Sequence, residues 1–203
     1  MLRITELKLP LDHTEAELST AIAAYLGIFE AAIISYSVFK RSYDARKGQM
    51  MLAYIIDLDV GGLEKKLLAQ FKADTHVMIT PDTSYHFVGQ APAHFSDNSS
   101  HRPIVVGFGP CGIFAALILA QMGFKPIVLE RGKKVRERTK DTWDLWRKNT
   151  LHPESNVQFG EGGAGTFSDG KLYSQIKDPR HLGRKVLNEF VKAGAPDEIL
   201  YVA

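Results

Sequence analysis

The stretch that most constrains the fold runs from Ile104 to Glu130 and reads IVVGFGPCGIFAALILAQMGFKPIVLE. Its β-branched opening is typical of a buried parallel strand, and the glycines that follow have the spacing GxGxxG. Small apolar residues then recur at helical spacing, Gly123 stands where a helix end is expected, and a second apolar run ends at Glu130. This order of strand, glycine turn, helix, strand and acid predicts a dinucleotide-binding unit.

Each residue of the glycine turn has an expected role. Gly107 lets the backbone turn sharply, Gly109 lets a pyrophosphate approach the main chain, and Gly112 lets the helix lie close to the strand. Pro110 sets the backbone φ of the first helical turn and donates no N–H. The amides of Cys111 and Gly112 are therefore expected to face the anion.

Glu130 ends the second strand about twenty residues beyond the glycines. A carboxylate there accepts hydrogen bonds from the ribose hydroxyls of an adenosine and disfavours a 2′-phosphate. We include its neighbour Arg131 in the expected cofactor site. FAD and NAD both contain this ribose, so Glu130 does not distinguish them, and glycines that merely close a turn in an unliganded protein are a further alternative.

A second glycine-rich segment, Gly160 to Leu172, reads GEGGAGTFSDGKL. It has too few apolar residues for the core of a strand or helix, so we expect a ligand-facing loop. Gly162, Gly163 and Gly165 permit close backbone approach, and Ser168 is among the side chains that offer hydrogen bonds. The alternative is a mobile glycine loop with no ligand.

From Arg102 to Tyr201 the chain resembles the poorly characterised bacterial FAD-dependent dehydrogenases, through VVGFGPCGIFAALILAQMGFKPIVLERG and NVQFGEGGAGTFSDGKLYSQIKD. Upstream, KRSYDARK (Lys40 to Lys47) is similar to the domain that precedes the flavin domain in those proteins. The resemblance implies an oxidoreductase whose first glycine turn cradles the FAD pyrophosphate, with the Gly160 to Gly170 loop near the flavin. NAD(P)H is a candidate electron donor, and neither a catalytic residue nor a substrate is assigned.

Proteins of this kind are much longer, so we expect this chain to be an amino-terminal portion that is inactive alone. A doubly wound sheet needs several covered parallel strands, and only two are evident after Arg102. A helix with an apolar stripe from Leu182 to Phe190 should end near Gly194, and a further strand is expected to begin at Leu200. Residues 103–203 are thus predicted to form an incomplete Rossmann-like FAD-binding domain.

Residues 1–88 show the order βαββαβ, which predicts a ferredoxin-like α+β domain, and the polar residues 89–102 are expected to be a linker. Thr14 and Glu17 form a capping box before a helix that stops at Gly27. The other expected elements are strands at Leu2–Leu11, Ile33–Lys40, Met51–Val60 and Val77–Val88, the last broken near Pro81, and a short helix at Leu63–Phe71. The overall fold class is α/β with α+β.

Composition narrows the classes of function. The formal net charge of +2 implies neither nucleic acid nor an anionic membrane as a partner. The single cysteine, Cys111, excludes a disulfide or dithiol pair within these residues and is expected to be a small packing residue. The histidines lack metal-ligand spacing, so no metal site is expected. With no apparent signal peptide or apolar span, we expect a cytoplasmic protein.

Three charged or aromatic segments leave alternatives open. The charges of KRSYDARK favour anion binding or docking on the flavin domain, or else an exposed hairpin. Trp143 and Trp146 are expected in a core, with stacking on a cofactor as the alternative, and the basic stretch Lys133 to Lys148 is expected on a solvated helix face. Two rival functions are an NAD(P)-binding Rossmann domain and a non-catalytic docking module for a partner.

Overall fold

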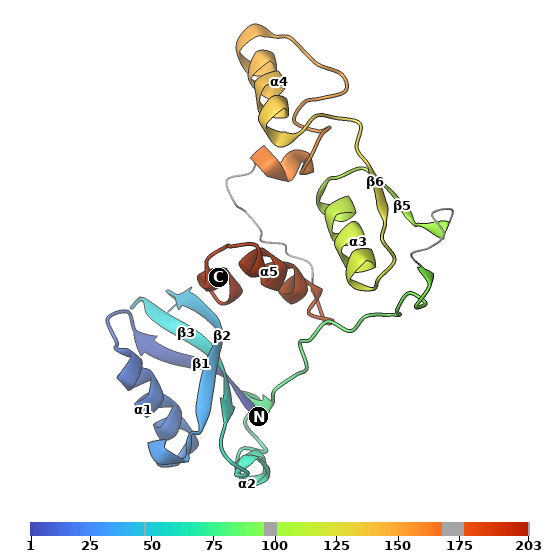
Figure 1. The fold of residues 1–203 in the computed structure, drawn as a ribbon. Coiled ribbons are helices and arrows are strands. Elements are labelled where there is room, and N and C mark those ends of the chain that lie inside the picture. The colour runs from blue at the N-terminus through green and yellow to red at the C-terminus, as the bar shows by residue number, and fades with distance from the viewer. Residues whose placement is uncertain (47, 96–100, 168–176, 203) are drawn as a thin grey trace. The chain divides into compact units, whose positions relative to one another are not determined.

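The computed structural model describes residues 1–46, 48–95, 101–167 and 177–202. The chain is a mixed α/β protein with a four-stranded antiparallel sheet and a two-stranded parallel sheet (Figure 1). It divides into two units, which we describe separately. The amino-terminal unit comprises Met1–Tyr85 with Asp178–Ala203, and the glycine-rich unit comprises His86–Lys177.

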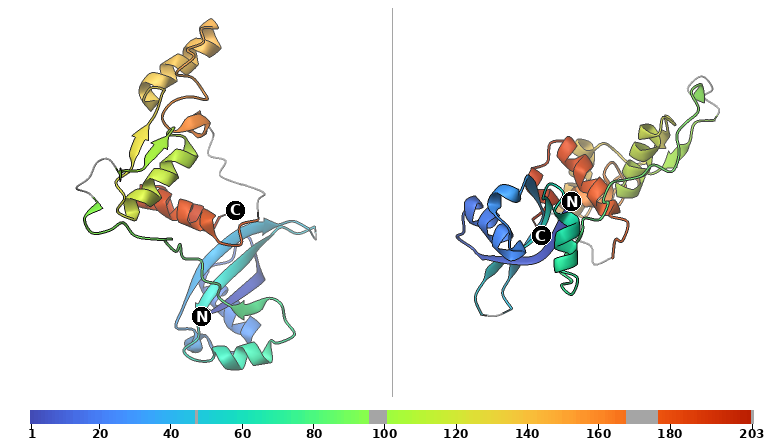
Figure 2. Two further views of the ribbon diagram at one scale, coloured as in Figure 1. Left: turned by 90° about the vertical axis from the view of Figure 1, so that its right-hand side faces the viewer. Right: turned by 90° about the horizontal axis from the view of Figure 1, so that it is seen from below.

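The amino-terminal unit is built on an antiparallel sheet with the strand order β2-β3-β1-β4. Helices α1 and α2 contribute to the core beside this sheet (Figure 2). The elements are β1 (Leu2–Pro10), α1 (Glu15–Leu26), the short 3-10 helix η1 (Glu30–Ala32), β2 (Ser35–Asp44), β3 (Met51–Asp59), α2 (Glu64–Gln70) and β4 (Val77–Ile79).

Alternation along the strands determines which side chains enter the core. The predicted inward face of β3 is confirmed, because alternate residues from Leu52 to Val60 are all buried. They pack with β1 and with Leu18, Ile22 and Leu26 of α1. The remaining buried apolar members of this core are Leu2, Ile4, Leu7, Leu9, Leu67 and Val77.

The ends of α1 match the sequence prediction. The Thr14 hydroxyl accepts a hydrogen bond from the Glu17 amide at 3.3 Å, and Glu17 Oε2 accepts one from the Thr14 amide at 2.6 Å. Gly27 ends the helix with φ of 65°. Local signals therefore suffice to place this helix.

The opposite face of the sheet carries a buried ion pair. Arg3 Nε and Nη2 donate to the two carboxylate oxygens of Asp57 at 2.6 and 2.8 Å. The Arg3 guanidinium also lies 3.7 Å from the centre of the Phe39 ring. Helix α5 (Leu182–Lys192) approaches from this side, with Arg184 5.0 Å from the same ring.

The carboxyl-terminal residues 178–203 belong to the amino-terminal unit, although the sequence predicts them as part of a Rossmann-like domain. After the 3-10 helix η5 (Asp197–Leu200), Val202 forms a parallel bridge with Arg41 of β2. The Arg41 amide donates to the Tyr201 carbonyl at 2.6 Å. Since β2 is an edge strand, its main chain was open to this pairing, and the expected Rossmann-like strand at Leu200 is wrong.

Strand β2 continues four residues beyond its predicted end at Lys40, through Asp44. The buried Asp44 carboxylate contacts Lys8 Nζ at 2.7 Å and Arg46 Nε at 2.8 Å, which ties this end of the strand to β1. Two charges of KRSYDARK are thus paired within the unit, and Lys47 lies outside the described residues. Strand β4 is shorter than predicted, ending at Ile79 before Pro81.

The glycine-rich unit contains two parallel strands, as predicted. Their register pairs Ile104 with Ile127 and Val106 with Leu129. Val106 is 84% exposed, so the small sheet leaves apolar surface uncovered. The elements are β5 (Ile104–Val106), α3 (Pro110–Gln121), β6 (Ile127–Leu129), α4 (Val135–Lys148) and the 3-10 helix η4 (Gly163–Phe167). In the described parts of the chain, no helix combines the length and apolarity that crossing a bilayer requires.

Candidate functional site

The first glycine turn lies at the carboxyl end of β5. Gly107 has φ of 92°, a value that L side chains rarely adopt, and its amide donates to the Leu129 carbonyl of β6 at 2.7 Å. Gly109 precedes α3 in an extended conformation, with φ of −80° and ψ of −175°. Pro110 is the first residue of the helix. The first turn of α3 therefore leaves main-chain amides without partners inside the helix.

Gly112 brings α3 against this turn. A Cβ at position 112 would lie 2.0 Å from the Gly107 carbonyl oxygen, which is far inside van der Waals contact. It would also lie 3.5 Å from a methyl group of Val105. The helix therefore lies as close to the strand as the sequence predicts, and only glycine fits there.

The second glycine-rich segment lies directly on the first. The Gly162 amide donates to the Phe108 carbonyl at 2.8 Å. A Cβ at Gly163, whose φ is 59°, would lie 3.0 Å from the Gly109 Cα and 2.9 Å from Pro110 Cδ. Two motifs that are about fifty residues apart in the sequence thus form one backbone surface.

Glu130 joins the turn to the end of β6. Its Oε2 accepts a hydrogen bond from the Phe108 amide at 2.6 Å, and its Oε1 accepts one from the Gly132 amide at 2.8 Å. Partial burial alone would raise the pKa of this carboxyl, but the main-chain donors prevail and lower it. Glu130 is therefore ionised at neutral pH, with its negative charge facing main-chain amides of the glycine turn and its neighbours.

A cleft of about 270 Å³ opens beside these groups. It is lined by residues from both glycine segments and from the carboxyl ends of both strands. They include Gly107, Gly109, Glu130, Arg131, Phe159 and Gly163. Crevices at the carboxyl ends of parallel strands are where α/β proteins bind nucleotides.

Arg131 borders the cleft and is held from two sides. Its guanidinium donates to the Glu154 carboxylate, at 2.6 Å from Nε, and lies 4.4 Å from the centre of the Phe159 ring. The hydrogen bond to Glu154 raises the pKa of Arg131. The ion pair of Arg131 with Glu154 is exposed, and Arg131 forms part of the cleft wall.

Sequence reasoning missed Arg138, which holds the second glycine segment in place. Its side chain is fully buried in α4, and its guanidinium donates to main-chain carbonyls of Asn156, Val157, Glu161 and Gly163 at 2.5 to 2.8 Å. Burial lowers its pKa, and among the residues described no carboxylate forms an ion pair with it. The only available signal was an arginine in a helix next to a glycine-rich loop.

The expectation of a solvated face for the basic stretch is therefore wrong in part, because Arg138, Asp141 and Thr142 are buried. The expectation that Trp143 and Trp146 lie in a core is also wrong. They are 44% and 55% exposed and form a T-shaped pair with ring centres 5.3 Å apart. Helix α4 turns its polar residues inward because the glycine loop offers carbonyls and few apolar side chains.

The remaining predicted site residues have different positions. Cys111 is exposed, so the expectation that it packs in the interior is wrong. Gly165 lies in η4, where an added Cβ would be 3.7 Å from Pro110 Cγ. Ser168 lies outside the described residues.

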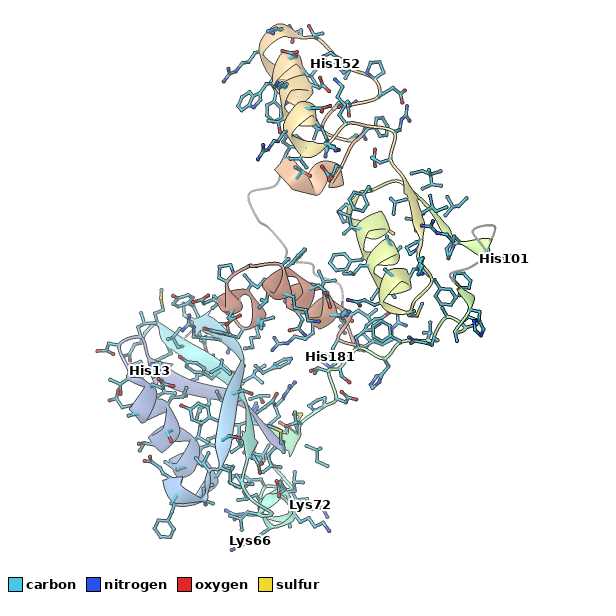
Figure 3. The ribbon with its side chains drawn as sticks, in the orientation of Figure 1. His13, Lys66, Lys72, His101, His152 and His181 are labelled. Carbon is cyan, nitrogen blue, oxygen red and sulfur yellow. The ribbon has the colours of Figure 1, made fainter. Side chains whose placement is uncertain are left out.

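The histidines are dispersed. His13 lies before α1, His152 after α4 and His181 before α5 (Figure 3). No group of three or more histidine, cysteine, aspartate or glutamate side chains in the described ranges has an arrangement that could hold a metal ion.

Two comparisons with known proteins gave matches. Residues 1–59 match a family model described as "Domain of unknown function (DUF8436)". A protein of Clostridium beijerinckii (strain ATCC 51743 / NCIMB 8052), named "Uncharacterized protein", is 40% identical over 216 aligned positions. The alignment covers 98% of this chain and 36% of that protein, so the chain spans about a third of the relative's length.

Proposed function

We propose that the glycine-rich unit is part of a Rossmann-like domain that binds the ADP portion of FAD. The chain would then be the amino-terminal portion of a flavin-dependent oxidoreductase, as its two motifs indicate. FAD would supply the hydride or electron chemistry, and this chain's residues would bind and orient it. For the amino-terminal unit, the strand order β2-β3-β1-β4 supports a ferredoxin-like fold.

The contact between the two glycine segments carries this proposal. It brings Gly107, Gly109 and the Glu130 carboxylate to the wall of one cleft, and Gly109 directly precedes α3. Main-chain amides at a helix start favour a pyrophosphate, and an ionised carboxylate at the end of the next strand suits a ribose. The residues present therefore fit the ADP portion of a dinucleotide.

Gly109 provides a sharp test, because its backbone conformation is open to alanine. An added Cβ would meet only the Gly163 Cα, at 3.7 Å, which is ordinary contact. Gly109→Ala should fold normally and place a methyl group where the pyrophosphate approaches. Gly89→Ala is the matched control, because a Cβ there meets nothing within 4 Å.

FAD binding is measured by quenching of flavin fluorescence as protein is added. We expect saturable binding by the wild-type chain and the control, and at least about tenfold weaker binding by Gly109→Ala. Equal affinity in Gly109→Ala, or no saturable binding by the wild-type chain, would contradict the proposal. If NAD binds and FAD displaces it only at great excess, the unit is a nicotinamide-binding domain instead.

A further inference from the structure

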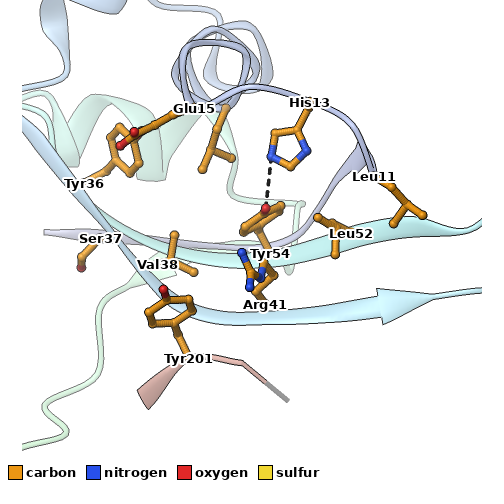
Figure 4. A pocket seen from close by; sticks show the side chains of 11 residues that line it. Leu11, His13, Glu15, Tyr36, Ser37, Val38, Arg41, Leu52, Tyr54 and Tyr201 are labelled. Atoms are coloured by element: carbon orange, nitrogen blue, oxygen red, sulfur yellow. Dashed lines mark hydrogen bonds between the residues drawn. The ribbon is translucent and has the colours of Figure 1, made fainter. Parts of the chain in front are cut away.

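A second cleft, of about 660 Å³, lies in the amino-terminal unit (Figure 4). It opens between the start of α1 and strands β2 and β3. One part of its wall is apolar and includes Leu18, Val38 and Leu52, and the other part includes His13, Arg41 and Tyr54. A wall of this composition suits a ligand with an apolar body and one polar group.

The Tyr54 hydroxyl has a fixed orientation in this cleft. His13 Nδ1 lies 2.7 Å from the Pro10 carbonyl oxygen, and a carbonyl only accepts hydrogen bonds, so Nδ1 carries the proton of the neutral ring. His13 Nε2 is then an acceptor, and the Tyr54 hydroxyl donates to it at 3.1 Å. The Tyr54 hydroxyl proton is therefore used within the protein and is not offered to a ligand.

Arg41 supplies a positive charge beside this hydroxyl. Its guanidinium is half-buried and lies 5.6 Å from the centre of the Tyr201 ring. Within the part of the chain that the structure describes, no carboxylate lies at ion-pair distance from Arg41. Burial raises the pKa of Tyr54, and the nearby Arg41 charge offsets part of this rise. The positive charge of the guanidinium is therefore close to the phenol oxygen. A half-buried guanidinium that has no carboxylate partner among the described residues is suited to a carboxylate ligand.

The cleft also limits the charge of its ligand. Glu15 lines it close enough to Tyr36 to raise the pKa of that phenol, although burial is the larger cause. A second negative group on the ligand would be repelled by the Glu15 carboxylate. The site therefore favours a monoanion.

We propose that this cleft binds a small monocarboxylate with a compact apolar or aromatic body. The carboxylate would pair with Arg41, and the body would lie against Leu18, Val38 and Leu52. Tyr201 completes the wall from the carboxyl-terminal segment, outside the residues that match the family model. The site thus combines that matched region with a segment far away in the sequence.

Sodium benzoate is the test ligand, and the readout is the change in amide NMR shifts of the full chain during titration. We expect saturable shifts around His13, Arg41 and Tyr54 with a Kd on the order of 1 mM. Benzamide, which has nearly the same shape without the charge, should bind at least about tenfold more weakly. No saturable shifts with benzoate, or equal affinity for benzamide, would overturn the proposal without requiring any variant.

Arg41→Gln should weaken benzoate binding at least about tenfold. Lys40→Gln removes the same charge from an exposed neighbouring residue and should change the affinity less than about twofold. Equal losses of affinity in both variants would mean that benzoate responds only to net charge. An unchanged affinity in Arg41→Gln would mean that benzoate binds elsewhere on the chain. Either result overturns the proposal.

Discussion

Replacing Arg138 with leucine should unfold the glycine-rich unit at a much lower denaturant concentration. The buried guanidinium donates to four main-chain carbonyls of residues 156, 157, 161 and 163, at 2.5 to 2.8 Å. Leucine fills part of the space but leaves these carbonyls without donors. Water reaches them only if the second glycine segment moves away from α4.

The expected cost follows from these hydrogen bonds. A hydrogen bond to a charged group contributes about 1.5–3 kcal/mol, so four of them set an upper bound of roughly 12 kcal/mol. The desolvation of the guanidinium opposes this sum, because no carboxylate pairs with it among the described residues. Carbonyls that become hydrated after the loop opens reduce the cost further. We therefore expect Arg138→Leu to lower the free energy of unfolding by about 3–5 kcal/mol.

Tryptophan fluorescence during urea unfolding reports on this unit alone, because the two tryptophans of the chain, Trp143 and Trp146, both lie in α4. Arg136→Leu removes an exposed arginine from the same helix and should change the free energy by less than about 0.5 kcal/mol. A cost below about 1 kcal/mol for Arg138→Leu would refute the argument. It would show that the guanidinium does not hold the second glycine segment.

Three further substitutions test other contacts. Gly112→Ala would force a Cβ to within 2.0 Å of a main-chain carbonyl oxygen and should destabilise the glycine-rich unit by about 1–3 kcal/mol. Asp57→Asn would leave the buried Arg3 guanidinium without a counterion and should cost about 3–5 kcal/mol. Asp44 has a pKa well below its usual range, chiefly because Arg46 donates to it, so it stabilises the fold above its unfolded pKa and loses this effect as the pH falls. Asp44→Asn should therefore lower the melting temperature near neutral pH, and its difference from wild type should narrow toward about pH 2.

Each of these tests has a matched control. Gly112→Ala is followed by tryptophan fluorescence beside Gly89→Ala, and equal stability of the two would show that α3 does not need a glycine at its contact with the strand. Asp57→Asn and Asp44→Asn are followed by thermal unfolding in circular dichroism, with the exposed Asp12→Asn as the reference. If Asp57→Asn lowers the melting temperature no more than Asp12→Asn does, the buried ion pair does not stabilise the sheet. If the difference in melting temperature between Asp44→Asn and wild type widened in acid, the ionised Asp44 carboxylate would not be the stabilising form.

Local signals explain why much of the fold was predictable. The capping box at Thr14, the left-handed glycine after α1 and the alternation along β3 each act over a few residues. The turn from β5 into α3 is local as well, and it accounts for Gly107, Gly109 and Gly112. The part of the candidate site that came from the sequence is therefore the part whose residues are neighbours in the chain.

Other features depend on contacts that the sequence does not display. Arg138 donates to carbonyls of residues that lie 18 to 25 positions further along the chain. The residues near it in the sequence are therefore those of an ordinary charged helix and do not reveal its role. The Leu200–Val202 segment has the residue types of a strand, but its partner was decided by the open edge of β2. The carboxylate of Glu130 also organises the glycine turn through main-chain amides, beyond its expected contact with a ribose.

The amino-acid sequence by itself determined the glycine turn, its strand and helix, and the alternating core of the antiparallel sheet. These depend on backbone sterics and on periodicity, which act between near neighbours. Only the tertiary structure decided that the second glycine segment lies on the first, that a buried arginine holds it there, and that Arg41 meets Tyr54 and Tyr201 in one cleft. Such contacts join residues far apart in the chain, and the folded backbone alone brings their hydrogen-bonding groups together.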